Sequence, residues 1–79
     1  MKYRVLYFAS LRDLAGRDLE EVEFPTNDAR ALYADLKRKH GFKIGEASLR
    51  IAVNGAFADW NRALNDGDEI AFLPPVSGG

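Results

Sequence analysis

One amphipathic stretch sets the strongest limit on how this chain can fold. Its apolar side chains recur three or four residues apart, at Ala29, Leu32, Tyr33 and Leu36, which is the spacing of a single buried helical stripe. Most other apolar residues lie in short alternating segments that are typical of strands. The sequence therefore predicts an α+β domain, in which a mixed sheet has one main helix packed across it.

Both ends of the predicted helix carry the expected signals. Thr26 or Asn27 can cap its N-terminus, and Asp28 suits the positive end of the helix dipole. Residues 37–40, Lys-Arg-Lys-His, occupy the last turn, where the dipole favours cations, and Gly41 ends the helix. This position explains the basic cluster. It also favours a structural role for the only histidine, because no second histidine or cysteine exists to complete a site.

Five segments are predicted to be strands: residues 2–8, 18–24, 49–54, 56–58 and 69–73. In residues 18–24 the apolar side chains do not alternate regularly, so the pattern does not fix the bounds of that strand. Side chains alternate along a strand, so Tyr3, Val5 and Tyr7 share one face of the first strand, and Ile70 and Phe72 share one face of the last. The opposite faces carry Leu6, Phe8 and Leu73, which another part of the chain or a partner must cover.

Two connections have recognisable local signals. Residues 9–16 predict a short helix with Leu11 and Leu14 three residues apart and Arg12 on its outer side. The pair Asn54-Gly55 predicts a tight turn between two strands. Residues 43–48 are predicted to be a loop.

The composition excludes several classes of function. A chain of 79 residues is expected to form one domain, 1–79, with a globular part at 1–75 and an extended tail at 76–79. Its 11 basic and 12 acidic residues give a net charge of −1, which disfavours binding to nucleic acid or to an anionic membrane. It has no cysteine for a disulfide, a metal site or a nucleophile, and the carboxylates at 66–69 fit a turn better than a metal loop. No apolar run is long enough for a signal or membrane-spanning segment, so a cytoplasmic location is expected.

The C-terminal segment has a composition suited to entering a narrow channel. Pro74-Pro75 restricts the backbone and holds the exit of the tail away from the domain. Val76 and Ser77 follow, and then Gly78 and Gly79, which lack a Cβ and would let a partner approach the terminal carboxylate closely. Four residues span at most roughly 13–14 Å, which is enough to enter a neighbouring active site. A frayed terminus without a function is the alternative interpretation.

Three stretches of this sequence carry a resemblance to a known family. Residues 66–79 (DGDEIAFLPPVSGG) are the most specific, and residues 6–12 (LYFASLR) and 51–54 (IAVN) agree with them. Together they resemble the small, sulfur-carrying subunit of molybdopterin synthase, a ubiquitin-like family, over the whole chain. The resemblance implies a ubiquitin-like β-grasp, in which the first and last strands lie side by side at the centre of the sheet.

The same resemblance implies a reaction cycle with several partners. An adenylating enzyme related to those of ubiquitin would use Mg-ATP to adenylate Gly79, and a sulfur donor protein would convert Gly79 to a thiocarboxylate. The tail, with Gly78 allowing access, would then enter the large subunit of molybdopterin synthase and pass sulfur to a pyranopterin precursor. The chain would thus act within a heterotetramer rather than as an enzyme alone, with no permanently bound cofactor and no metal. The predicted partner-binding residues are Phe8, Arg12, Phe57, Leu73, Pro74, Pro75, Val76 and Ser77.

Three other functions share parts of this pattern. A thiamine-pathway sulfur carrier has the same fold and Gly-Gly chemistry, although the approach over residues 74–77 favours molybdopterin. A ubiquitin-like protein modifier would form isopeptide bonds with lysines instead of a thiocarboxylate. A non-catalytic interaction domain would not use its tail, and would keep its partner's activity after removal of Gly79.

Overall fold

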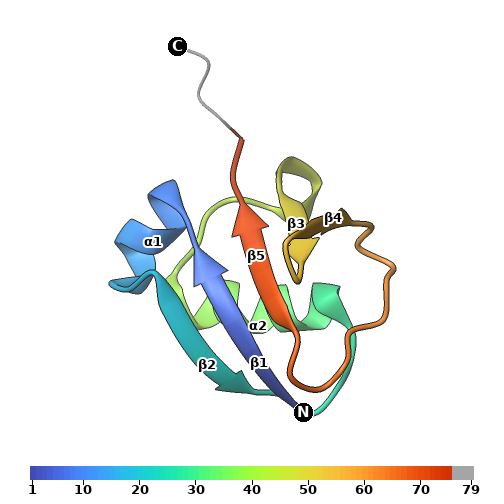
Figure 1. Cartoon of the computed structure of the whole chain (residues 1–79). Coiled ribbons are helices and arrows are strands. Elements are labelled where there is room, and N and C mark those ends of the chain that lie inside the picture. Colours follow the sequence, from blue (N-terminus) through green and yellow to red (C-terminus); the bar gives the residue numbers. More distant parts are fainter. Residues whose placement is uncertain (76–79) are drawn as a thin grey trace.

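The computed structural model describes residues 1–75 of the chain, and these residues form a single mixed sheet with helices packed against it (Figure 1). The strands are β1 (Lys2–Tyr7), β2 (Leu19–Glu23), β3 (Arg50–Val53), β4 (Ala56–Ala58) and β5 (Glu69–Leu73). The helices are α1 (Ala9–Ala15), α2 (Ala29–His40) and a 3-10 turn, η1 (Glu46–Ser48), inside the segment predicted to be a loop.

The sheet has the strand order β2-β1-β5-β3-β4. Its two central strands, β1 and β5, come from opposite ends of the chain and run parallel, with Val5 opposite Ile70 and Tyr7 opposite Phe72. The remaining pairs, β1 with β2, β5 with β3 and β3 with β4, are antiparallel. This arrangement confirms the predicted α+β class and the β-grasp topology.

Helix α2 crosses one face of the sheet and closes the core (Figure 1). Its four stripe residues, Ala29, Leu32, Tyr33 and Leu36, are all buried, as predicted. They meet the inward side chains of the central strands, and Leu64 from the long connection before β5 completes the same cluster. The strand residues in this apolar cluster are Tyr3, Val5, Tyr7, Ile51, Val53, Ile70 and Phe72.

Residue Asp28, and not Thr26 or Asn27, caps α2. Its carboxylate accepts hydrogen bonds from the backbone N–H groups of Arg30 at 2.9 Å and Ala31 at 3.4 Å. The chain just before the helix is held extended, because the N–H of Leu64 donates to the carbonyl oxygen of Asn27 at 2.9 Å. That contact between segments distant in sequence shifts the start of the helix past Asn27.

Short-range patterns were less accurate in α1 and β2. Leu11 is fully buried, but Leu14 is 47% exposed, because a helix of seven residues at the end of the sheet buries one position rather than a stripe. In β2 the buried inward residue is Glu20, whereas Leu19 is exposed. The Asn54-Gly55 turn is confirmed, since both residues have positive φ, 52° and 85°.

Candidate functional site

We call the face of the sheet opposite α2 the open face (Figure 1). It contains an apolar region. Leu6 of β1 and Ala71 of β5 are paired neighbours there, and Ala52 of β3 pairs with Ala71 on its other side. Two aromatic side chains stand out from this region: Phe8 is 43% exposed and Phe57 is 62% exposed. Exposed aromatic side chains beside an apolar sheet surface indicate a site that another molecule covers.

At the end of β5, this apolar region deepens into what we call the C-terminal hollow. It has a volume of about 660 Å³. Its lining comes from the end of β1, the start of β3, β4 and the last described residues of the chain: Phe8, Ala9, Ser48, Arg50, Phe57, Leu73, Pro74 and Pro75. A smaller hollow of about 270 Å³ adjoins it and shares Phe8, Phe57 and Leu73. Because they share these residues, the two hollows form one depression near the end of the described chain, and its lining is apolar except for Ser48 and Arg50 in the larger hollow and Glu69 in the smaller one.

Backbone geometry at the end of β1 directs Phe8 into this depression. Phe8 itself is extended, and Ala9 follows with φ of 50°, in the left-handed region that a residue with a Cβ rarely adopts. The chain turns sharply there into α1. The aromatic ring of Phe8 thus lies just beyond the end of a central strand, where no further strand residue of β1 follows it.

One positively charged side chain, that of Arg50, also lines the C-terminal hollow. Arg50 begins β3 on the open face, opposite Leu73 of β5. Its guanidinium carbon Cζ is 3.9 Å from the centroid of the Phe57 ring, well within cation–π range. Arg50 is the only charged residue in the lining of the C-terminal hollow.

The structure brings together most of the predicted partner-binding residues that it describes. Phe8, Phe57, Leu73 and the Pro74-Pro75 pair all line the C-terminal hollow. Arg12 is exposed on α1 and is not part of that lining. The predicted tail residues, Val76, Ser77, Gly78 and Gly79, lie outside the described residues.

The sequence did not lead us to predict Arg50 as a residue of this site. Its outward direction could have been predicted, because Leu49 and Ile51 were both predicted to face inward, and Arg50 between them must then face outward. What the sequence did not show is that β4 brings Phe57 beneath the guanidinium, which requires the pairing of β3 with β4.

Apart from the C-terminal hollow, a polar cluster lies on the side of the sheet that α2 covers, around the buried carboxylate of Glu20. Its oxygens accept hydrogen bonds from the Tyr7 hydroxyl at 2.7 Å and from Nζ of Lys39 at 2.7 Å, and Nε2 of His40 lies 2.8 Å away. Burial alone would raise the pKa of Glu20, but the hydrogen bonds from Lys39, Tyr7 and His40 outweigh it and lower that pKa to about 2. Burial, and then the bond to Glu20, raise the pKa of the Tyr7 hydroxyl. Every group in the cluster is occupied by its neighbours, which indicates a structural role.

A third set of polar contacts fixes the start of β5. Asp68 is buried and accepts from Nδ2 of Asn54 at 2.9 Å and from the backbone N–H of Asn65 at 2.8 Å. Asn54 in turn accepts from the N–H of Glu69 at 3.0 Å. Two of the stretches that carry the family resemblance, residues 51–54 and 66–79, therefore contain the polar contacts that align β3 with β5.

Other classes of site find no support among residues 1–75. No group of three or more histidine, cysteine, aspartate or glutamate side chains in that range is placed to hold a metal ion. Searched over the same residues, no helix is both long and apolar enough to span a membrane. The apolar depression on the open face is thus the candidate functional site.

These features define a ubiquitin-like β-grasp protein that presents an apolar sheet face at the foot of its C-terminal segment. The fold is shared with a ubiquitin of Caldiarchaeum subterraneum, at a TM-score of 0.65 and 18% identity. Residues 5–79 match the model of the ThiS family, and the chain belongs to that family.

Individual relatives agree with this assignment. The molybdopterin synthase sulfur carrier subunit of Escherichia coli is 40% identical, in an alignment covering 96% of this chain and 98% of that protein. The protein of the same description from Mycobacterium tuberculosis is 36% identical, over 100% of this chain and 99% of its own. Among solved structures, a complex of subunits 1 and 2 of molybdopterin-converting factor from Helicobacter pylori contains a chain that matches with a TM-score of 0.71. That chain is 34% identical, with full coverage of both chains.

Proposed function

We propose that this protein is the sulfur-carrier subunit of a molybdopterin synthase and works by docking its open face on a large subunit. The observation that carries the proposal is the C-terminal hollow, which places exposed aromatic side chains at the foot of the segment that ends in Gly78 and Gly79. Relatives described as sulfur carrier subunits align along nearly their whole length. The subunit complex from Helicobacter pylori supports a large-subunit partner.

In this proposal the chemistry takes place at the terminal carboxylate of Gly79. A carboxylate is a poor electrophile, so an activating enzyme first transfers AMP from Mg-ATP to it and releases pyrophosphate. Sulfur at the sulfide level, supplied by the sulfur donor, then attacks the acyl carbon, forms a C–S bond and releases AMP, which leaves a thiocarboxylate. Inside the large subunit, the thiocarboxylate sulfur, which is anionic at neutral pH, attacks a carbon of the pyranopterin precursor and displaces an oxygen leaving group. Hydrolysis of the resulting acyl–sulfur bond then leaves the sulfur on the precursor and restores the carboxylate of Gly79.

The described residues supply docking and not acid–base chemistry. Within residues 1–75, every buried side-chain nitrogen or oxygen has a hydrogen-bond partner. The buried ionisable groups Glu20 and Tyr7 bind one another, and Asp68 binds Asn54. None of them is free to exchange a proton with a substrate, so the proposal assigns the acid, base and cation groups of the reaction to the partner.

The first test is the intact mass of the protein. After incubation with its activating enzyme, ATP and a sulfur donor, the mass should show exchange of one oxygen for sulfur, and fragmentation should place the sulfur on Gly79. Protein incubated without ATP is the control and should keep its original mass. Sulfur on an internal residue, or no sulfur after complete incubation, would contradict the proposal.

The second test separates docking from folding. Phe8→Ala and Leu73→Ala remove side chains from the lining of the C-terminal hollow, so each should weaken binding to the large subunit by about tenfold or more, as expected for an interface anchor. Because Phe8 is exposed and Leu73 is half-buried, unfolding midpoints in urea should stay close to wild type.

Leu14→Ala is the matched control for docking, because Leu14 is equally exposed but lies on α1 and is not in the lining of the hollow. It should leave binding unchanged. If Phe8→Ala or Leu73→Ala instead destabilised the isolated domain by about 3 kcal/mol, the side chain would belong to the core and not to a docking surface.

A further inference from the structure

The C-terminal hollow is apolar except for one charge, the guanidinium of Arg50. We infer that Arg50, held over Phe57, determines partner specificity by pairing with a carboxylate of the large subunit. This inference rests on the proposed function and adds the chemistry by which the partner is recognised.

The contact with Phe57 gives the Arg50 side chain a defined position. A free arginine on a strand surface samples many rotamers, and ordering them on binding has an entropic cost. Here the 3.9 Å contact between Cζ and the ring centroid restricts the side chain before any partner arrives. A guanidinium that stacks on a ring keeps its N–H donors available for a bidentate interaction with a carboxylate.

Within residues 1–75, no carboxylate lies within ion-pair distance of Arg50. The nearby arginine on α2, Arg30, is different, since it pairs with Glu46 and also donates to Asn61. A partner that covers the hollow therefore removes water from an uncompensated charge. Such burial is strongly unfavourable unless the partner supplies an anion. An otherwise fitting surface with an apolar side chain at this point would be rejected, which is how a single charge produces specificity.

The position of Arg50 favours a protein carboxylate over a phosphate of a small substrate. Arg50 lies at the foot of the C-terminal segment, beside Pro74 and Pro75. Gly79 is the fourth residue after Pro75, so the segment beyond Pro75 can span at most roughly 13–14 Å. The substrate reacts at the far end of that segment, whereas the foot meets the surface of the partner protein. Between the two proteins that must bind the segment we choose the large subunit, because a homologous chain is solved in complex with subunit 2 of molybdopterin-converting factor.

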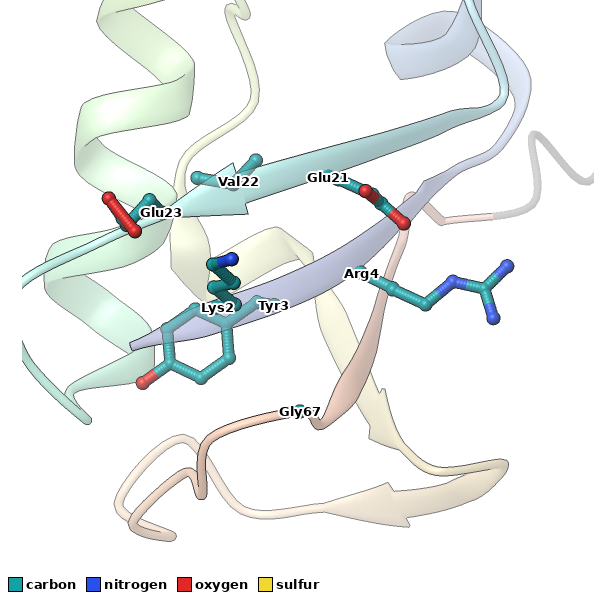
Figure 2. A pocket seen from close by; sticks show the side chains of 7 residues that line it. All are labelled: Lys2, Tyr3, Arg4, Glu21, Val22, Glu23 and Gly67. Atoms are coloured by element: carbon teal, nitrogen blue, oxygen red, sulfur yellow. The ribbon is translucent and has the colours of Figure 1, made fainter.

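A matched control is available at the opposite end of the open face. There Arg4 of β1 lies with Lys2, Glu21 and Glu23 around a separate pocket of about 310 Å³ (Figure 2). Arg4 has the same charge and the same outward direction on the sheet as Arg50, but its neighbours include two acidic side chains and no exposed aromatic ring. Its removal changes the net charge of the domain by the same amount without touching the C-terminal hollow.

The experiment is calorimetric titration of the large subunit with wild type and variants at low and at high salt. Arg50→Gln should weaken binding by about tenfold or more and should flatten its salt dependence. Arg50→Lys should be intermediate, because it keeps the charge but loses the planar fork. Phe57→Leu should also be intermediate, because it keeps apolar area but releases the guanidinium. Arg4→Gln should stay within about twofold of wild type.

The acidic residues on the binding surface of the large subunit can then be replaced by alanine one at a time. One of these substitutions should weaken binding to the wild-type carrier but should not weaken binding to the Arg50→Gln carrier any further, which is the sign of a direct pair. Arg50→Gln binding with wild-type affinity and salt dependence would overturn the inference. So would a loss of affinity for the activating enzyme alone. If wild type itself did not bind the large subunit, the proposed function would fail instead, which is a distinguishable result.

Discussion

Replacing Glu20 with alanine should destabilise the domain by about 3 kcal/mol, the largest stability effect that we expect from a single polar residue of this protein. The carboxylate is 7% exposed and binds Tyr7, Lys39 and His40 at once. Lys39 can turn to solvent, but the buried Tyr7 hydroxyl and the partly buried His40 ring would lose their acceptor. Urea unfolding at neutral pH measures the effect.

The same contribution should depend on pH in a defined direction. The pKa of Glu20 is lowered from 4.5 in the unfolded chain to about 2 in the folded domain. The stabilisation, on the order of 3 kcal/mol, is therefore complete above pH 4.5 and is lost as the pH falls from there towards 2. The difference in stability between wild type and Glu20→Gln should shrink over that window.

Glu21→Gln is the control for this experiment. Glu21 is the next residue along β2, is exposed on the open face and pairs in register with Arg4. The Glu21→Gln substitution removes the same charge from the same strand, but should change the free energy of unfolding by less than about 0.5 kcal/mol. A Glu20→Gln variant as stable as Glu21→Gln, or a difference that does not change with pH, would show that the cluster does not hold β2 to α2.

The Glu20 cluster also shows where prediction from the sequence reaches its limit. Alternation assigned the inward residues of β1 and β5 correctly, because every inward side chain there is apolar and the pattern is unbroken. In β2 the inward position is filled by a glutamate, which a binary pattern assigns to solvent. The partners that make its burial favourable, Lys39 and His40, are about twenty residues away. Their meeting depends on the packing of α2 on the sheet, which local patterns do not contain.

For the candidate site the limit lies elsewhere. The outward positions of Phe8 and Leu73 follow from strand alternation, and the parallel pairing of the first and last strands then brings them together. The contribution of Phe57 depends on β4, a strand of three residues whose pairing with β3 places an exposed ring under Arg50. Sequence alone predicted the strand but not this contact. Arg12 was transferred by resemblance, and the structure leaves it outside the hollow.

The largest functional effect is expected at Gly78. This residue lies outside the described residues, and the expectation comes from its chemistry: a Cβ and two methyl groups beside the reacting carboxylate would obstruct entry into a narrow channel. Gly78→Val should reduce sulfur transfer by about 100-fold or more, because small displacements of a reacting group have effects of that size. The melting temperature should not change. The measurement is product formation by the reconstituted synthase, beside thermal unfolding of the free subunit.

Two comparisons make the Gly78 result specific. Ser77→Val places the same side chain one residue earlier, at a position that already carries a Cβ, and should retain far more activity. Carrier protein supplied with its thiocarboxylate already formed separates the two steps, because a Gly78→Val variant that still fails must be blocked in the large subunit and not in activation. Wild-type transfer by Gly78→Val would show that the channel accommodates a branched side chain. The requirement for glycine would then belong to the activating enzyme, or to neither partner.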